Sequence, residues 1–216
     1  MFKKRTLFYF CISLFLSSAH AQNANGEFFI GGSVAFPFEN ATVHWENLYA
    51  AKDLSSEHLT GSGIQASFDF GCVTGNNVYF DSSYGLGGAR FSSCTAFTMS
   101  ALMSLGLDIT PQKNIEVIPS VVGGMFAHFF DKEKLVYQKE RNTFQSEISL
   151  FIGPELIIRK HVSYDTGIVF RLPFLFGIGY SRFNFYNPYT KQQDHVPGYN
   201  TAFLFIPQIG FYHAFR

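Results

Sequence analysis

The sequence has few charges, few cysteines and no long apolar segment after its N-terminus. Only 15% of the 216 residues are charged, so the clustered Lys and Arg that bind nucleic-acid phosphates are missing. Beyond the first residues, no apolar run approaches the length of about 18 residues that a membrane-spanning helix needs. These absences argue against a nucleic-acid partner and against a helical membrane protein.

Aromatic residues, in contrast, are abundant. The chain has 27 Phe and 11 Tyr, an unusual number for a soluble domain with so few charges. Aromatic residues form girdles at both interfaces of membrane β-barrels. The composition therefore favours a membrane β-barrel.

The N-terminus has the pattern of a secretory signal peptide. Lys3, Lys4 and Arg5 precede an apolar run over 7–16, which ends in Ser17-Ser18-Ala19-His20-Ala21. This run is too short for a membrane anchor, the alternative interpretation. We expect cleavage after Ala21, a signal peptide over 1–21 and a barrel domain over 22–216. Of 16 basic and 16 acidic residues, the signal peptide removes three basic ones, which leaves a net charge of −3.

Hydrophobic periodicity of two is the main secondary-structure signal. From Thr95 to Ile109, one face carries mainly large apolar residues and the other mainly Ser, Thr and Gly. Fifteen residues of alternation exceed a typical globular strand and fit one that crosses a membrane at a tilt. Similar segments predict eight strands in all, at 27–36, 64–70, 77–88, 95–109, 115–130, 147–158, 165–177 and 203–215.

The predicted connections alternate in length. Short ones are expected at 72–76, 110–114 and 159–163, and long ones at 37–60, 131–142 and 181–198, with a brief exception at 89–93. Outer-membrane barrels combine short periplasmic turns with longer external loops. We therefore predict an all-β, eight-stranded antiparallel up-and-down transmembrane barrel. Pro119, Pro154, Pro173 and Pro207 fall inside these strands, and we expect bulges at some of them.

The two faces of the strands distinguish a membrane barrel from a soluble one of the lipocalin type. A soluble barrel would carry many Lys and Glu on its outer face. Here the polar face is mostly Ser, Gly and Thr, and such small residues suit the narrow interior of an eight-stranded barrel. The large apolar residues then face lipid.

Two segments carry a resemblance to a known family. The last strand closes on Phe211-Tyr212-His213-Ala214-Phe215, and Ile152-Gly153-Pro154-Glu155-Leu156 precedes a short polar turn. The chain thus resembles the small bacterial outer-membrane β-barrels typified by the transmembrane domain of outer-membrane protein A. The resemblance implies an outer-membrane location in a Gram-negative envelope, lipid contacts, and recognition of the C-terminal strand by the barrel-assembly machinery. It implies no particular activity.

Charged residues on the inward face are the first candidates for a site. Arg171 lies near mid-height of its strand, and Glu147, Glu155 and Asp81 also face inward. An unpaired buried charge costs several kcal/mol, so we expect a lumen charge network between Arg171 and these carboxylates. The network either fills the barrel or acts as a plug that gates an ion path.

A second group of acids gathers toward the periplasmic end. We expect these acids to be solvated at the barrel mouth or to favour cations that enter there. They are Asp69, Asp108, Glu116 and Asp165.

Catalytic and metal-binding patterns are weak. His161-Val162-Ser163 has the spacing of a nucleophile and its base in lipid A-modifying barrels, but it lies in a predicted periplasmic turn, away from outer-leaflet lipid. No His forms a close pair in the sequence with Cys or a carboxylate, so no metal site and no cofactor are predicted. Cys72 and Cys94 are predicted at opposite ends of the barrel, which argues against a disulfide.

Three functional hypotheses remain at this point. The first is a non-enzymatic barrel that stabilises the envelope or binds partners through its external loops. The second is a narrow, porin-like channel for small solutes or ions, and the third is a lipid A-modifying enzyme. Trp45, Phe183, Phe185, Tyr186 and Tyr189 in the expected loops either anchor a partner or belong to the interfacial girdle.

Overall fold

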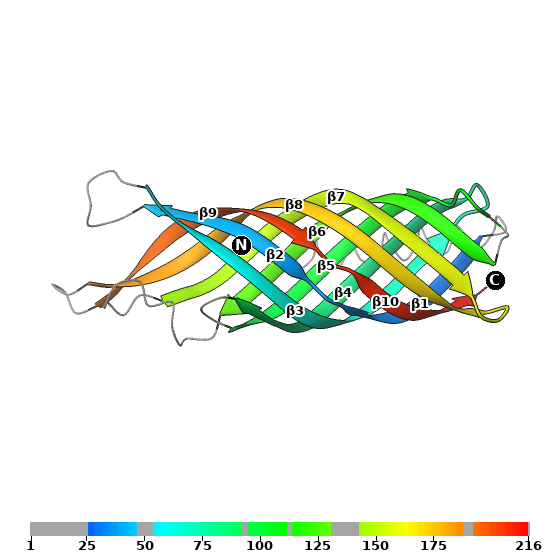
Figure 1. The fold of residues 1–216 in the computed structure, drawn as a ribbon, viewed down its shortest axis with the longest axis horizontal. Coiled ribbons are helices and arrows are strands. Elements are labelled where there is room, and N and C mark those ends of the chain that lie inside the picture. The colour runs from blue at the N-terminus through cyan, green and yellow to red at the C-terminus, as the bar shows by residue number, and fades with distance from the viewer. Residues whose placement is uncertain are drawn as a thin grey trace, which may run out of the picture.

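The computed structural model describes residues 26–46, 54–91, 95–111, 114–130, 143–187 and 192–215, which form one elongated β-barrel (Figure 1). No helix in this part of the chain is long and apolar enough to cross a membrane. The strands are β1 (Glu27–Ala35), β2 (Phe38–Glu46), β3 (Leu54–Val73), β4 (Val78–Phe91), β5 (Thr95–Leu107), β6 (Ile115–Phe130), β7 (Thr143–His161), β8 (Thr166–Asn187), β9 (Gln192–Phe205) and β10 (Gln208–Phe215).

These ten segments make a barrel wall of eight strands. β1 and β2 both pair with β3 in one continuous register, and only Phe36-Pro37 separates them. β9 and β10 pair with β8 in the same way on either side of Ile206-Pro207. The predicted eight-stranded antiparallel up-and-down barrel is therefore confirmed.

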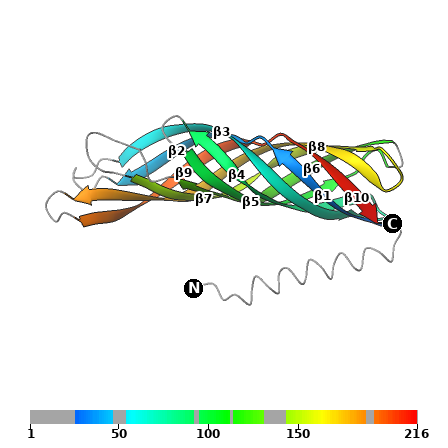
Figure 2. The same ribbon diagram turned by 90° about the horizontal axis from the view of Figure 1, so that it is seen from below.

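The barrel closes between its first and last strands. β1 pairs antiparallel with β10, with Phe28 opposite Phe215, and Figures 1 and 2 both show these two strands side by side. Tight turns connect strands at this end. In one of them Asn77 has a φ of 63°, a left-handed conformation that Asn tolerates better than most residues.

The strands extend further than the sequence pattern predicts. Much of the expected loops at 37–60 and 181–198 is strand, because β2 pairs with β3 and β8 pairs with β9 almost to their far ends. On β2 and β3 the outward residues Asn40, His58 and Thr60 are exposed and polar. Strands that project beyond lipid need no apolar outer face, so the alternation that identifies them fades.

The prolines do not shift the register. Pro119, Pro154 and Pro173 lie within β6, β7 and β8, while Pro207 lies in the break between β9 and β10. Among the described strand pairs, the irregularity falls elsewhere, between Phe144 and Ser146. The bulges expected at the prolines are therefore wrong. The proline carbonyl groups still accept hydrogen bonds, since the Phe36 amide donates to Pro207 O at 2.9 Å.

The side chains on the outer face of the barrel are apolar, and those on the inner face are buried and are often small or charged. On adjacent β7 and β8, Leu150, Ile152, Phe176 and Ile178 are 61–69% exposed on the outside. Inward positions of the same strands, such as Ser149 and Ser181, are almost fully buried. This pattern satisfies the backbone within a closed barrel and presents apolar side chains to lipid.

Candidate functional site

A buried arginine forms the centre of the lumen. Arg171 on β8 places Nη2 2.6 Å from Asp81 of β4 and 3.1 Å from Ser104 Oγ of β5. Its Nε lies 3.1 Å from Glu155 Oε1 of β7, and its Nη1 lies 3.7 Å from Asp69 Oδ1 of β3. All four charged side chains are at most 6% exposed. We call this group the Arg171 layer.

The Arg171 layer is tied to its surroundings by further polar contacts. The Tyr79 hydroxyl donates to Asp81 Oδ2 at 2.7 Å, and Ser120 Oγ lies 3.2 Å from Glu155 Oε2. Because these contacts come from β4, β6, β7 and β8, the layer crosses the whole lumen. Ions buried this deeply are stable only with such partners.

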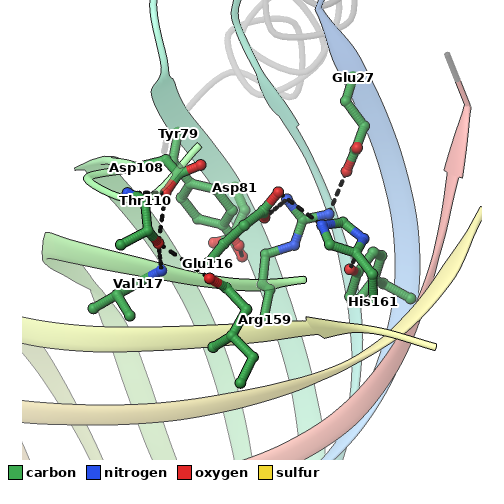
Figure 3. A network of polar contacts seen from close by, with 11 residues as sticks. Glu27, Tyr79, Asp81, Asp108, Thr110, Glu116, Val117, Arg159 and His161 are labelled. Atoms are coloured by element: carbon green, nitrogen blue, oxygen red, sulfur yellow. Dashed lines mark hydrogen bonds and ion pairs between the residues drawn. The ribbon is translucent and has the colours of Figure 1, made fainter. Parts of the chain in front are cut away.

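A second arginine lies near the end of the barrel where the tight turns are. Arg159 on β7 forms ion pairs with Glu27 of β1 and with Glu116 of β6, the latter at 3.0 Å (Figure 3). Its guanidinium carbon also lies 4.7 Å from the ring centre of Phe29 and 4.1 Å from that of Tyr212. We call this group the Arg159 layer.

A histidine completes the Arg159 layer. His161 Nε2 is 2.8 Å from Glu116 Oε1, and its Nδ1 is 2.9 Å from the Tyr212 hydroxyl. Close by, Asp108 accepts a hydrogen bond from the Thr110 amide at 2.9 Å (Figure 3). These contacts link β6, β7 and β10 at the mouth.

The two arginine layers enclose a packed apolar layer. A cavity of about 10 Å³ lies next to Arg159 and Arg171, enough for one water molecule at most. A larger hollow of about 480 Å³ is lined by residues that include Ile30, Val162 and Phe211, which face outward. The apolar layer consists of Phe29, Tyr79, Ile118, Ile157, Val169, Tyr212 and Ala214, all at most 8% exposed.

The far half of the lumen holds a second apolar cluster and a third polar group. His128 Nε2 of β6 is 3.1 Å from Glu39 Oε2 of β2, and its Nδ1 is 3.9 Å from Glu147 Oε2 of β7. We call these three residues the His128 cluster. The apolar side chains that fill this half include Leu102, Phe126, Phe151, Leu175 and Leu204.

The structure brings together most of the predicted lumen network but not all of it. Arg171, Asp81 and Glu155 meet as expected. Glu147 does not join them, which corrects the prediction. It lies eight residues from Glu155 along β7, about 26 Å at 3.3 Å per residue, beyond the reach of the guanidinium.

The four acidic residues predicted at the barrel mouth do not all lie together. Asp69 is not solvated at the mouth but is 4% exposed beside Arg171, because β3 carries it into the barrel. Asp108 and Glu116 are at the mouth, and both are buried rather than solvated, at 4% and 8% exposed. Asp165 lies half-buried in the turn between β7 and β8, where its carbonyl accepts a hydrogen bond from the Ala214 amide.

Sequence reasoning missed Arg159 and the His128 cluster. The sequence pattern predicts a turn at residue 159, whereas β7 continues to His161. Extending the inward alternation of Glu147, Ser149 and Glu155 by four residues would have identified Arg159. No local signal could have found the His128 cluster, because the heights at which Glu39, His128 and Glu147 lie depend on strand tilt and register.

The remaining expectations concern nucleophiles, cysteines and the N-terminus. Ser163 Oγ pairs with Thr166 Oγ1 at 2.7 Å rather than with His161, whose two nitrogens already contact Glu116 and Tyr212. Cys72 is free and buried. Cys94 and the predicted signal peptide lie outside the described residues.

The same architecture is found in solved structures of outer-membrane proteins. The chain is similar to the outer membrane protein OprG from Pseudomonas aeruginosa, with 14% identity and a TM-score of 0.63 over 88% of this chain and 96% of that one. This chain has the fold of the small bacterial outer-membrane β-barrels. Its apolar outer wall and this fold support an outer-membrane location.

A second solved structure agrees on the fold. Similarity to the outer membrane protein AlkL, determined in lipid bilayers, gives 11% identity and a TM-score of 0.50 over 89% of this chain and 92% of that one. No protein-family model matches the sequence, and no curated protein matches it. At these identities the likeness extends to the fold alone.

Proposed function

We propose that this protein is a non-enzymatic outer-membrane barrel with a closed lumen. In this proposal its role is structural, or is carried by the strands that extend beyond the lipid. The observation that carries the proposal is the Arg171 layer, in which one guanidinium contacts Asp81, Glu155 and Asp69 across the lumen. Packed apolar side chains lie next to this layer on both sides.

The non-enzymatic part of the proposal is supported by the state of the one candidate nucleophile pair. His161 is engaged by Glu116 and Tyr212, and Ser163 is engaged by Thr166. A nucleophile needs its base within hydrogen-bonding reach. Neither partner of this pair supports the other.

The proposed partners follow from the surface of the barrel. The exposed apolar side chains of β7 and β8 would contact outer-membrane lipid. The alternating strand β10, with Phe211 and Phe215 exposed on its outer face, would be recognised by the barrel-assembly machinery. The rim made by β2, β3, β8 and β9 would meet any external partner.

The test is a current recording across a planar bilayer that contains the refolded protein, followed by the same recording with Arg171→Ala. We expect no discrete conductance steps from the wild type, because ions cannot pass a filled lumen. Steps in the wild type would favour the narrow-channel alternative and contradict the closed lumen. Steps that arise only in Arg171→Ala would show that this side chain closes the path.

A further inference from the structure

The His128 cluster brings three metal-binding side chains together inside the barrel. Glu39, His128 and Glu147 each offer a ligand atom, and these atoms all lie within 4.8 Å of one another. The three side chains are at most 3% exposed. They come from β2, β6 and β7, so the cluster joins β2 to the neighbouring pair β6 and β7 across the lumen.

The cluster has an excess of negative charge. Two carboxylates face one imidazole, and among the described residues no Lys or Arg forms an ion pair with Glu39 or Glu147. The surroundings are aromatic, since the rings of Phe91, Phe126 and Phe130 lie 5.0–5.9 Å from that of His128. Buried carboxylates in such a setting need a cation or a proton between them.

Three ligand atoms of the cluster make no hydrogen bond, and two of them face each other at 3.9 Å. Glu39 Oε1, Glu147 Oε2 and His128 Nδ1 are buried without a hydrogen bond. The other oxygen of Glu147 is held by Ser149 Oγ at 3.1 Å and by the side-chain amide of Asn200. Buried polar atoms are almost always satisfied, so these three atoms are available to a bound cation.

Neighbouring residues orient the cluster in the way that metal ligands are usually supported. Asn200 donates to both Glu147 and Ser149, the latter at 2.8 Å. Gly179 of β8 leaves room for this arrangement, since a Cβ there would lie 2.2 Å from Ser149 Oγ and 2.4 Å from Asn200 Oδ1. Hydrogen bonds to a ligating carboxylate fix its position and raise metal affinity.

We propose that Glu39, His128 and Glu147 bind one divalent transition-metal ion of the zinc class inside the lumen. A set of one imidazole and two carboxylates matches the donors that Zn²⁺ uses, whereas Ca²⁺ and Mg²⁺ take oxygen ligands. The charge of the ion neutralises both carboxylates. The ion would also crosslink β2 to β6 and β7 and so stabilise the outer half of the barrel. This proposal does not depend on whether the lumen conducts.

The test begins with the full chain refolded in detergent with an equimolar amount of ZnCl₂ and then desalted. We expect about one tightly held zinc ion per folded chain by mass spectrometry of the metal. X-ray absorption at the zinc edge is expected to show nitrogen and oxygen ligands at about 2.0–2.2 Å. A desalted protein without zinc would overturn the proposal and leave a protonated imidazole between the two carboxylates as the explanation.

Matched variants locate the ion. His128→Gln should abolish zinc retention, while His161→Gln, which alters the His–Glu pair at the barrel mouth, should leave it unchanged. If His128→Gln does not give the heat-modifiable gel band of a folded barrel, Glu39→Gln and Glu147→Gln replace it, each with an expected loss of affinity of at least about tenfold. Equal zinc content in folded wild type and in these variants would place the ion at exposed histidines and would overturn the proposal.

Discussion

The Arg171 layer and the His128 cluster occupy the same lumen and solve the same electrostatic problem differently. Both gather more carboxylates than fixed cations from strands on opposite sides of the barrel. The Arg171 layer contains a guanidinium, which stays charged at any physiological pH. The His128 cluster contains only an imidazole, whose charge depends on a proton. The Arg171 layer therefore contains a permanent cation, whereas the His128 cluster takes its positive charge from a proton or, in our proposal, from a metal ion.

The largest expected effect comes from removing the guanidinium of the first layer. Arg171→Met should lower the free energy of unfolding by about 3–5 kcal/mol, because it leaves Asp81, Glu155 and Asp69 buried together without a cation. Urea unfolding in lipid vesicles, followed by gel mobility, measures the change. Arg182→Met, on the exposed outer face of the same strand, is the matched control. Equal losses in both variants would contradict the account of this layer.

Smaller losses should separate the acids within the Arg171 layer. Asp81→Asn should cost about 1.5–3 kcal/mol, because Asp81 accepts a charge-assisted hydrogen bond from Arg171 and a further bond from Tyr79. Asp69→Asn should change stability by less than about 1 kcal/mol, because Asp69 lies 3.7 Å from the guanidinium and neither carboxylate oxygen has a hydrogen bond. The same unfolding experiment compares them, and a reversed order would refute this ranking.

The Arg159 layer should tolerate loss of its cation better than the Arg171 layer does. The side chains of Glu27 and Glu116 are 12% and 10% exposed, more than those of the acids in the Arg171 layer, so water can reach them when Arg159 is removed. Arg159→Met should therefore cost about 1–3 kcal/mol, part of it from lost contacts with Phe29 and Tyr212. Unfolding of Arg159→Met and Arg171→Met under one set of conditions compares their losses in the free energy of unfolding. Equal losses would show that depth in the lumen has no influence.

The smallest effect is expected in the His128 cluster without metal. With a chelator present, Glu147→Gln should alter the free energy of unfolding by less than about 1 kcal/mol, because the lost hydrogen-bond strength is offset by relief of the repulsion from Glu39. Zinc should then stabilise the wild type and not the variant. Thermal unfolding of both proteins with and without zinc makes the comparison. Stabilisation of both would show that the ion acts elsewhere.

The barrel could be predicted from the sequence because its outer face meets lipid. Alternation between large apolar residues and small polar ones identifies each strand where it crosses the membrane, as it does from Thr95 onward. Beyond the lipid the outward residues on β2 and β3, such as Asn40 and Thr60, are polar. The alternation disappears there, so the sequence pattern predicts loops where these strands continue.

The interior could be predicted only as far as each strand's own pattern reaches. Arg171 and Asp81 lie in strands with clear alternation, which predicts that both side chains face inward and can pair. The alternation does not predict that Glu147 lies with Glu39 and His128. The height of a residue along the barrel axis depends on strand tilt and on the register between neighbouring strands. Tilt and register are known only when every strand is paired with its neighbour.

The pairing of Phe28 with Phe215 has a consequence for the order of events during folding. Every other seam of the barrel joins strands that follow one another along the chain, but this seam joins positions separated by nearly all of the described sequence. Contacts between residues so far apart form late, because the intervening chain must first be ordered. The guanidinium of Arg171 on β8 and the carboxylate of Asp81 on β4 lie on opposite walls, so we expect them to meet only as this seam closes. Closing the ring and completing its central ion pair would then be a single, final step of assembly.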